Sequence, residues 1–162
     1  MTSQLSLPNY EDVCAAAERV RPYVRETPVL THGAIDAAAG AQVFVKAECL
    51  QVTGSFKMRG AANRLAQIPA EGREAGVVAF SSGNHAQGVA RAARLMGMPA
   101  VIVMPSDAPQ VKIAGVKADG GEVVLFDRDT ESREEISQRL AAERGALVVP
   151  SYDDTHIIAG QG

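Results

Sequence analysis

Residues 76–88 read GVVAFSSGNHAQG, and this stretch decides the fold. It contains a short apolar run, GVVAF (76–80), then a polar turn, and then a segment of helical character that begins at Asn84. A short continuous apolar run is typical of a strand that is buried on both faces of its sheet. Because such a strand leads directly into a helix, the stretch predicts βαβ units and an α/β protein.

The same alternation of helix and strand continues from Gly54 to about residue 150. It predicts an open, parallel, twisted sheet with flanking helices and right-handed crossovers. Gly97, Gly120 and Gly145 each follow a predicted helix, where a left-handed backbone stop is common. The predicted helices span 57–67, 84–96, 109–118 and 131–144, and the predicted strands span 76–80, 100–104, 122–126 and 146–149.

The regions outside this alternation are less regular. We predict a first helix at 9–20 with Asn9 as its N-cap, an irregular stretch over 21–40, and a short strand at 42–47. The apolar residues 157–159 predict the opening of another helix, and the chain ends before that helix would be complete. We therefore expect a fragment or a truncated product.

Composition excludes several classes of function. The chain has 162 residues, 46% hydrophobic and 22% charged, with a net charge of −3 and both signs interspersed. This balance argues against a nucleic-acid footprint and a polybasic membrane anchor. The first residues do not resemble a signal peptide, and every apolar run is too short to span a bilayer. Two isolated cysteines and three scattered histidines predict no metal site and fit a reducing cytoplasm.

The turn SSGNHAQG (81–88) has the character of an anion site. It lies between a strand and a helix, where free backbone N–H groups and the positive helix end favour a carboxylate or phosphate. Ser81, Ser82 and Asn84 add side-chain donors. The alternative is an ordinary turn capped by serine and asparagine. The stretch is neither GxGxxG nor a Walker A sequence, which removes support for dinucleotide and triphosphate sites.

Residues 53–60 read TGSFKMRG and place Lys57 in the first turn of a predicted helix that Ser55 can cap. The helix dipole disfavours a cation there, and a partly desolvated cleft would also lower the pKa of the amine. Such a lysine is a good nucleophile toward a carbonyl and can form a Schiff base. From residue types alone, a capped helix with a solvated lysine remains the favoured alternative, because lysine is usually exposed.

The two motifs together resemble one family. SFKMRGA (55–61) followed by SSGNHAQGVA (81–90) is similar to the fold-type II pyridoxal-phosphate enzymes, in the threonine/serine dehydratase and serine racemase branch. AVIVMP (100–105) and the terminal GQG (160–162) extend the similarity over nearly the whole chain. The cysteine synthase-like branch usually reads SxKDRxA. Met58 stands in place of that aspartate, which favours the dehydratase branch.

The resemblance implies pyridoxal 5′-phosphate as cofactor. It implies that Lys57 holds the cofactor as a Schiff base and that Phe56 lies against the pyridine ring. Asn84 would donate a hydrogen bond to the cofactor's 3′-oxygen. The glycine-rich loop for the phosphate and the polar partner of the pyridine nitrogen normally lie beyond residue 162 in this family.

The resemblance also implies a substrate site for a small amino acid. Ser81, Ser82, Asn84 and His85 would hold the substrate carboxylate. Ser82 would lie on the cofactor face opposite Lys57, where a racemase needs a second proton donor and acceptor. Arg133 resembles an arginine that secures dicarboxylate ligands in racemase-like members, although it is equally a solvated helix charge.

The function implied is an ammonia-lyase that converts L-threonine or L-serine to a 2-oxo acid and ammonia. The alternatives are an amino-acid racemase of the same family and, from another class, a non-catalytic truncated α/β module. The domain division implied is 1–53 for part of a large domain, 54–150 for a small α/β domain, and 151–162 for a return into the truncated large domain. At full length we expect a cytoplasmic homo-oligomer.

Overall fold

The computed structural model describes residues 7–162, and its centre is a four-stranded parallel sheet with the order β5–β4–β3–β6. β3 pairs with β4 in the register Val77↔Ala100, and β4 pairs with β5 in the register Val101↔Glu122. The predicted parallel sheet is therefore confirmed. The strands are β3 (Val77–Phe80), β4 (Ala100–Pro105), β5 (Glu122–Phe126) and β6 (Leu147–Val148).

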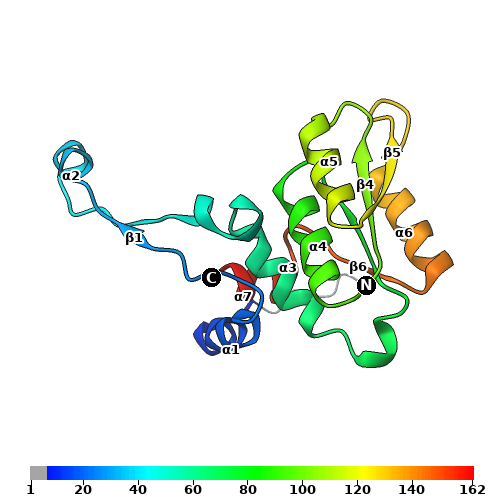
Figure 1. The fold of residues 1–162 in the computed structure, drawn as a ribbon, viewed down its shortest axis with the longest axis horizontal. Coiled ribbons are helices and arrows are strands. Elements are labelled where there is room, and N and C mark those ends of the chain that lie inside the picture. Colours follow the sequence, from blue (N-terminus) through cyan, green and yellow to red (C-terminus); the bar gives the residue numbers. More distant parts are fainter. Residues whose placement is uncertain (1–6) are drawn as a thin grey trace.

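Helices cover both faces of this sheet (Figure 1). Side chains alternate across it: Val77 and Ala79 belong to the core on the α3 and α4 side, and Val78 packs with the α6 residue Leu140 on the other. This alternation explains why the strands read as continuous apolar runs. The flanking helices are α3 (Lys57–Ala66), α4 (Asn84–Leu95), α5 (Gln110–Ala118) and α6 (Arg133–Arg144).

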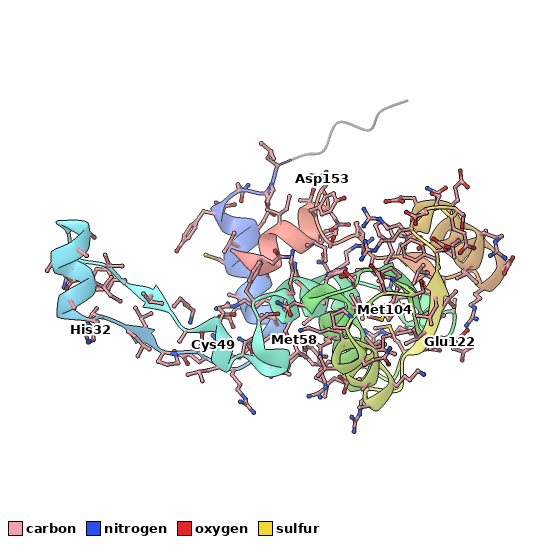
Figure 2. All side chains as sticks on the ribbon, turned by 90° about the horizontal axis from the view of Figure 1, so that it is seen from above. His32, Cys49, Met58, Met104, Glu122 and Asp153 are labelled. Carbon is pink, nitrogen blue, oxygen red and sulfur yellow. The ribbon has the colours of Figure 1, made fainter. Side chains whose placement is uncertain are left out.

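The larger core contains Met58 of α3 and Met104 of β4, both fully buried. Figure 2 shows these methionines within the body of the molecule, whereas His32 lies far from them at the tip of an extension. Left-handed glycines follow three helices as predicted: Gly97 (φ 68°), Gly120 (φ 78°) and Gly145 (φ 66°).

A second group of helices packs beside the sheet. α1 (Tyr10–Val20) and α7 (Thr155–Gln161) lie against α3. The predicted cap at Asn9 is confirmed, since Asn9 and Asp12 each accept a hydrogen bond from the other's backbone N–H. The predicted helix opening at 157–159 is confirmed as well, and Asp154 is its N-cap.

Residues 26–47 form an extension that we call the N-terminal arm. It carries a two-stranded antiparallel ribbon, β1 (Val29–Leu30) with β2 (Val45–Lys46), and at its tip α2 (Gly33–Ala39). Figure 1 shows α2 standing away from the sheet at the end of two extended segments. α2 buries no residue, and several apolar side chains of the arm are exposed, among them Leu30 (52%) and Phe44 (64%).

Two predictions for this region were wrong. Residues 21–40 are not irregular throughout, because His32 caps α2 at its start and Gly40 (φ 65°) ends it in the left-handed region. The strand predicted at 42–47 is limited to Val45–Lys46, because within residues 7–162 it pairs with the two-residue β1 alone. Short 3₁₀ turns at Glu48–Leu50 and Val52–Gly54 lead from the arm to α3, and a third lies at Ala70–Gly72.

Boundaries elsewhere differ by one or two residues. The helix predicted from residue 131 begins at Arg133, because the Ser132 side chain accepts the Glu135 N–H as its N-cap. The last predicted strand is shortened to Leu147–Val148.

We predict that Gly160→Ala lowers the free energy of unfolding by about 1–3 kcal/mol through overpacking. A Cβ at this position would lie 2.6 Å from the Asn63 Cβ and 2.9 Å from the Arg59 carbonyl oxygen, so α7 would have to move away from α3. Gly33→Ala is the matched control, since a Cβ there meets nothing within 4 Å. Urea unfolding measures both, and equal effects would contradict the close contact.

Candidate active site

The amine of Lys57 lies in a partly buried position at the start of α3. Its Nζ donates to the Ser151 carbonyl oxygen at 2.9 Å, and the Gln161 Oε1 lies at 3.4 Å. Desolvation lowers the pKa of Lys57 from its ordinary value. The Phe56 ring, 43% exposed, has its centroid 5.1 Å from the same nitrogen. The alternative of a lysine directed into bulk water therefore fails.

Ser55 does not cap α3 as predicted. The N-cap is Phe56 in the right-handed helical conformation, and no side chain caps the helix. Ser55 stands one residue earlier, in extended backbone, and its hydroxyl is buried without a hydrogen-bond partner. Lys57 nevertheless occupies the first helical position, where the helix dipole opposes a positive charge.

The turn at 81–85 follows the carboxyl end of β3, where open α/β sheets bind ligands. The Ser81 N–H donates to the Val103 carbonyl, and the Ser81 hydroxyl accepts the Gly83 N–H at 3.1 Å. Gly83 is the N-cap of α4, and no side chain caps this helix. The Ser81 hydroxyl thus closes the turn, as the alternative of a serine-capped turn expects, but no side chain caps the helix itself, and the first N–H groups of α4 stay available for an anion.

His85 is buried at the start of α4, with 2% of its surface exposed. Its Nε2 lies 3.1 Å from the Val149 carbonyl oxygen, so Nε2 carries the proton and donates it, while Nδ1 is buried without a partner. Burial lowers the pKa of His85 to about 4, and the charge of Lys57 lowers it further than burial alone would. The imidazole is thus neutral at physiological pH.

Close packing of α3 on α4 brings Lys57 and the 81–85 turn to the same place. A Cβ at Gly88 would lie 3.2 Å from the Lys57 carbonyl oxygen. The electrostatic effect of Lys57 on His85 reports the same proximity between the two side chains. The structure therefore unites two motifs that are separated by more than twenty residues in the chain.

Arg133 lies at the start of α6, next to the end of β3. Its guanidinium carbon is 5.1 Å from the centroid of the Phe80 ring, and Phe80 directly precedes Ser81. A hydrogen bond with Glu134 at 2.7 Å raises the pKa of Arg133, and Tyr152 adds to this effect. Arg133 therefore lies at the edge of the sheet where the parallel strands end, on the α6 side.

Asn84 and Ser82 occupy the open part of the turn. Asn84 is exposed, and its Oδ1 accepts a hydrogen bond from Lys112 at 2.8 Å. Ser82 is half-buried. The loops after β4 and β5 are joined by an ion pair between Arg128 and Asp107.

Residue types and spacing in the sequence do not reveal three groups that touch the site. They are the Ser151 carbonyl and Gln161, which hold Lys57, and Lys112, which holds Asn84. The contacts of Ser151 and Lys112 cannot be predicted from sequence. Ser151 acts through its backbone carbonyl, which every residue type has, and Lys112 resembles any exposed lysine on a helix. Gln161 was present only within the GQG similarity.

The donor set fits a carbonyl-bearing, anionic cofactor. The site offers one partly desolvated amine, an uncapped helix start, and a neutral imidazole. The buried Gln161 Nε2 has no hydrogen-bond partner, so the region keeps a donor unsatisfied. The aldehyde of a pyridine cofactor can form a Schiff base with the amine, and the oxygen atoms of such a cofactor can accept hydrogen bonds from the donors.

Two findings concern the described part of the chain as a whole. Across residues 7–162, no three His, Cys, Asp or Glu side chains gather closely enough to hold a metal ion. Among the helices of the same residues, none has both the length and the apolar character needed to cross a membrane.

Comparison with known proteins decides the family. A family profile described as "Pyridoxal-phosphate dependent enzyme" matches residues 20–162. The chain belongs to this family of pyridoxal-phosphate-dependent enzymes. The enzymes of this family depend on pyridoxal 5′-phosphate. The family includes both lyases and racemases.

Relatives in the pyridoxal-phosphate family cover nearly all of the chain. An L-threo-3-hydroxyaspartate ammonia-lyase from a Pseudomonas species is 54% identical over 158 residues, which are 98% of this chain and 50% of that protein. A serine racemase from Schizosaccharomyces pombe is 44% identical over 162 residues, or 100% of this chain and 50% of that protein. The chain spans about half the length of the curated relatives it matches.

Solved structures agree with the fold of this family. Maize serine racemase superimposes with a TM-score of 0.91 at 41% identity, over 96% of this chain and 47% of that one. Serine racemase from Dictyostelium discoideum superimposes with a TM-score of 0.90 at 35% identity, over 96% of this chain and 50% of that one. The resemblance drawn from the two motifs is thus confirmed at the level of family and fold.

We predict that His85 makes stability depend on pH between about 4 and 6.5. Its pKa is lower in the folded state, so the unfolded chain binds more protons in this window and stability rises with pH. The stabilisation is fully present above pH 6.5 and is lost as pH falls through 4, a loss of about 3 kcal/mol from the size of the shift. Chemical denaturation across this range measures it.

His85→Gln is the matched variant for this prediction, because it keeps a side-chain donor for the Val149 carbonyl and cannot titrate. Carboxylates contribute to both profiles equally, so the difference between the two curves isolates the imidazole. Parallel profiles for the wild type and the variant would contradict the assignment of a buried, neutral His85.

Proposed function

We propose that the whole protein is an ammonia-lyase that uses pyridoxal phosphate to remove ammonia from a β-hydroxy amino acid. The observation that carries the proposal is the Lys57 amine, which is partly desolvated, has a lowered pKa, and lies beside a turn whose helix start has no side-chain cap. One group can bind an aldehyde and move a proton, and the other can hold a carboxylate.

Lys57 has two roles in this proposal. Its amine would hold the cofactor by its aldehyde group, and the free amine would take the α-proton of the substrate. The lowered pKa leaves more of the amine in the neutral form that accepts a proton. The Ser151 carbonyl and the Gln161 side chain limit where the released amine can lie. When bound, the cofactor supplies an electron sink for the bond broken at the α-carbon.

The turn at 81–85 orients the substrate. We propose that the first N–H groups of α4, with Ser81 and Ser82, bind the substrate carboxylate. His85 stays neutral and, by donating to Val149, ties the start of α4 to the chain just after β6. We assign Asn84 to the cofactor's 3′-oxygen and Phe56 to one face of its ring. The α-hydrogen would then face the Lys57 amine.

The position of Arg133 favours a dicarboxylic substrate. It lies against Phe80, one residue before the turn that we assign to the α-carboxylate. Arg133 donates through Nε to Glu134 and also interacts with Tyr152, and we propose that its guanidinium pairs with a second carboxylate of the substrate. Similarity to the L-threo-3-hydroxyaspartate ammonia-lyase from Pseudomonas supports the same choice. 3-Hydroxyaspartate would give oxaloacetate and ammonia, whereas L-serine and L-threonine would give pyruvate and 2-oxobutyrate.

A racemase is the second candidate, because Ser82 belongs to the turn beside Lys57 and the chain is 44% identical to a serine racemase. Accumulation of D-serine in place of pyruvate from L-serine would favour it. A third possibility is a folded α/β module that does not turn over. Failure of the protein to take up cofactor would favour that module.

We also propose the division into domains that the family resemblance implies. Residues 54–150 form the small domain, and residues 1–53 and 151–162 belong to a larger one. The exposed apolar side chains of the N-terminal arm support this division, because they lack a core of their own within residues 7–162. We expect the full-length enzyme to be a cytoplasmic homo-oligomer that takes a small amino acid.

We predict that the protein develops a visible absorption band when pyridoxal phosphate is added and that Lys57→Ala abolishes the band. Borohydride reduction followed by peptide mass spectrometry should then place the cofactor's mass on the peptide that contains Lys57. Lys117→Ala is the control, because Lys117 is an exposed lysine at the far end of α5. An unchanged band in Lys57→Ala would contradict the assignment of Lys57 as the residue that binds the cofactor.

We predict that Arg133→Gln lowers kcat/KM for L-threo-3-hydroxyaspartate by about 10- to 100-fold, the value of one lost charged hydrogen bond. Activity on L-serine should change little, since L-serine has no second carboxylate. Arg139→Gln is the matched control on the same helix, where Arg139 is exposed and pairs with Glu143. Equal losses of kcat/KM on both substrates would show that Arg133 supports the structure of the site and does not select the substrate.

A further inference from the structure

Lys112 of α5 reaches across to the first turn of α4. Its Nζ donates to the Asn84 Oδ1 and to the Gln87 Oε1, each at 2.8 Å. Residues 84 and 87 are one turn apart and therefore lie on the same face of α4. A single cation thus holds two amide side chains, and one of them is the side chain that we assign to the cofactor.

The chemistry of lysine fixes which way these amides point. An ammonium group can only donate, so both amides must present their oxygen atoms to it. The Nδ2 of Asn84, with its two N–H donors, is then directed away from Lys112. The positive charge also polarises the amide, which strengthens the N–H as a donor. Without Lys112, the amide could rotate and present either atom to a ligand.

Gly115 holds the second amide in place. A Cβ at Gly115 would lie 2.4 Å from the Gln87 Nε2, so the end of the Gln87 side chain lies directly on this glycine. Gly115 and Lys112 are one turn apart on α5, as Asn84 and Gln87 are on α4. The contact fixes Gln87 with its oxygen toward Lys112, and Lys112 in turn is held beside Asn84.

We infer that Lys112 is a positioning residue that fixes the Asn84 amide as a donor toward the cofactor's 3′-oxygen. The inference rests on the proposed role of Asn84 in cofactor binding. Lys112 does not touch the cofactor in this arrangement. It acts by excluding the rotated amide, which would set a carbonyl oxygen against the oxygen of the cofactor and would repel it.

The first test uses the cofactor-free protein. The side-chain amide signals of Asn84, assigned by their loss in Asn84→Ala, are recorded by ¹H–¹⁵N NMR in the wild type and in Lys112→Met. We expect one sharp pair of signals in the wild type and shifted, broadened signals in the variant. Lys117→Met on the same helix, exposed and distant from the contact, should leave them unchanged.

The second test measures the cofactor itself. Lys112→Met should raise the Kd for pyridoxal phosphate by about 2- to 10-fold, the value of one weakened hydrogen bond, and should shift the visible band of the bound form. Lys112→Arg keeps a donor of the same charge and should restore part of the affinity. Gly115→Ala displaces Gln87 while favouring the helix, so a raised Kd in this variant would not come from a weakened α5.

The outcomes separate this inference from the proposed function. If Lys112→Met leaves both the Asn84 signals and the Kd as in the wild type, the positioning role is overturned, and the function still stands on Lys57. If the Asn84 signals change but the Kd and the band do not, Lys112 orders the amide without serving the cofactor, which also overturns the inference. A band that persists in Lys57→Ala would instead overturn the proposed function.

Discussion

The close approach of α3 to α4 and α7 is the constraint on which the site depends. Glycine is required where these helices touch: a Cβ at Gly60 would lie 2.9 Å from the Ile157 carbonyl oxygen, and one at Gly88 would lie 3.2 Å from the Lys57 carbonyl oxygen. The short distance between these helices places the first turn of α3 next to Ser151 and next to the start of α4. Lys57 is partly desolvated because of this packing, and its amine meets the Ser151 carbonyl for the same reason.

The electrostatics of the site follow from that packing. Two basic side chains, Lys57 and His85, share one small region, and burial together with their mutual repulsion favours the neutral form of the imidazole. The nearby start of α4 adds a positive dipole with no side-chain acceptor. The region is thus rich in donors and poor in negative charge, which suits an anionic ligand.

The N-terminal arm contrasts with this ordered centre. Each strand of its ribbon is two residues long, α2 buries nothing, and several large apolar side chains lie open to solvent. An isolated two-stranded ribbon has little stability of its own, because it has no hydrophobic face to bury. The arm therefore differs from the central sheet and the helices packed on it, which enclose an apolar core on each face of the sheet.

The sequence by itself determined the α/β class, the parallel sheet, the helix stops at three glycines and the family. These features depend on local patterns: buried strands read as apolar runs, left-handed stops favour glycine, and the motifs around Lys57 and the 81–85 turn are contiguous. It did not determine the helix in the arm, because this short helix buries no residue and so shows no apolar pattern, or the N-cap of α3, where Ser55 stands one residue too early.

Only the tertiary structure decided what surrounds the amine and the amide. The Ser151 carbonyl comes from a loop 94 residues after Lys57, Gln161 from 104 residues after it, and Lys112 reaches Asn84 from 28 residues away. A backbone carbonyl leaves no trace in residue type, and a lysine on a helix looks the same whether it is solvated or bridges two amides. Contacts of this kind arise from how helices cross, and the crossing is set by packing between segments that no local pattern connects.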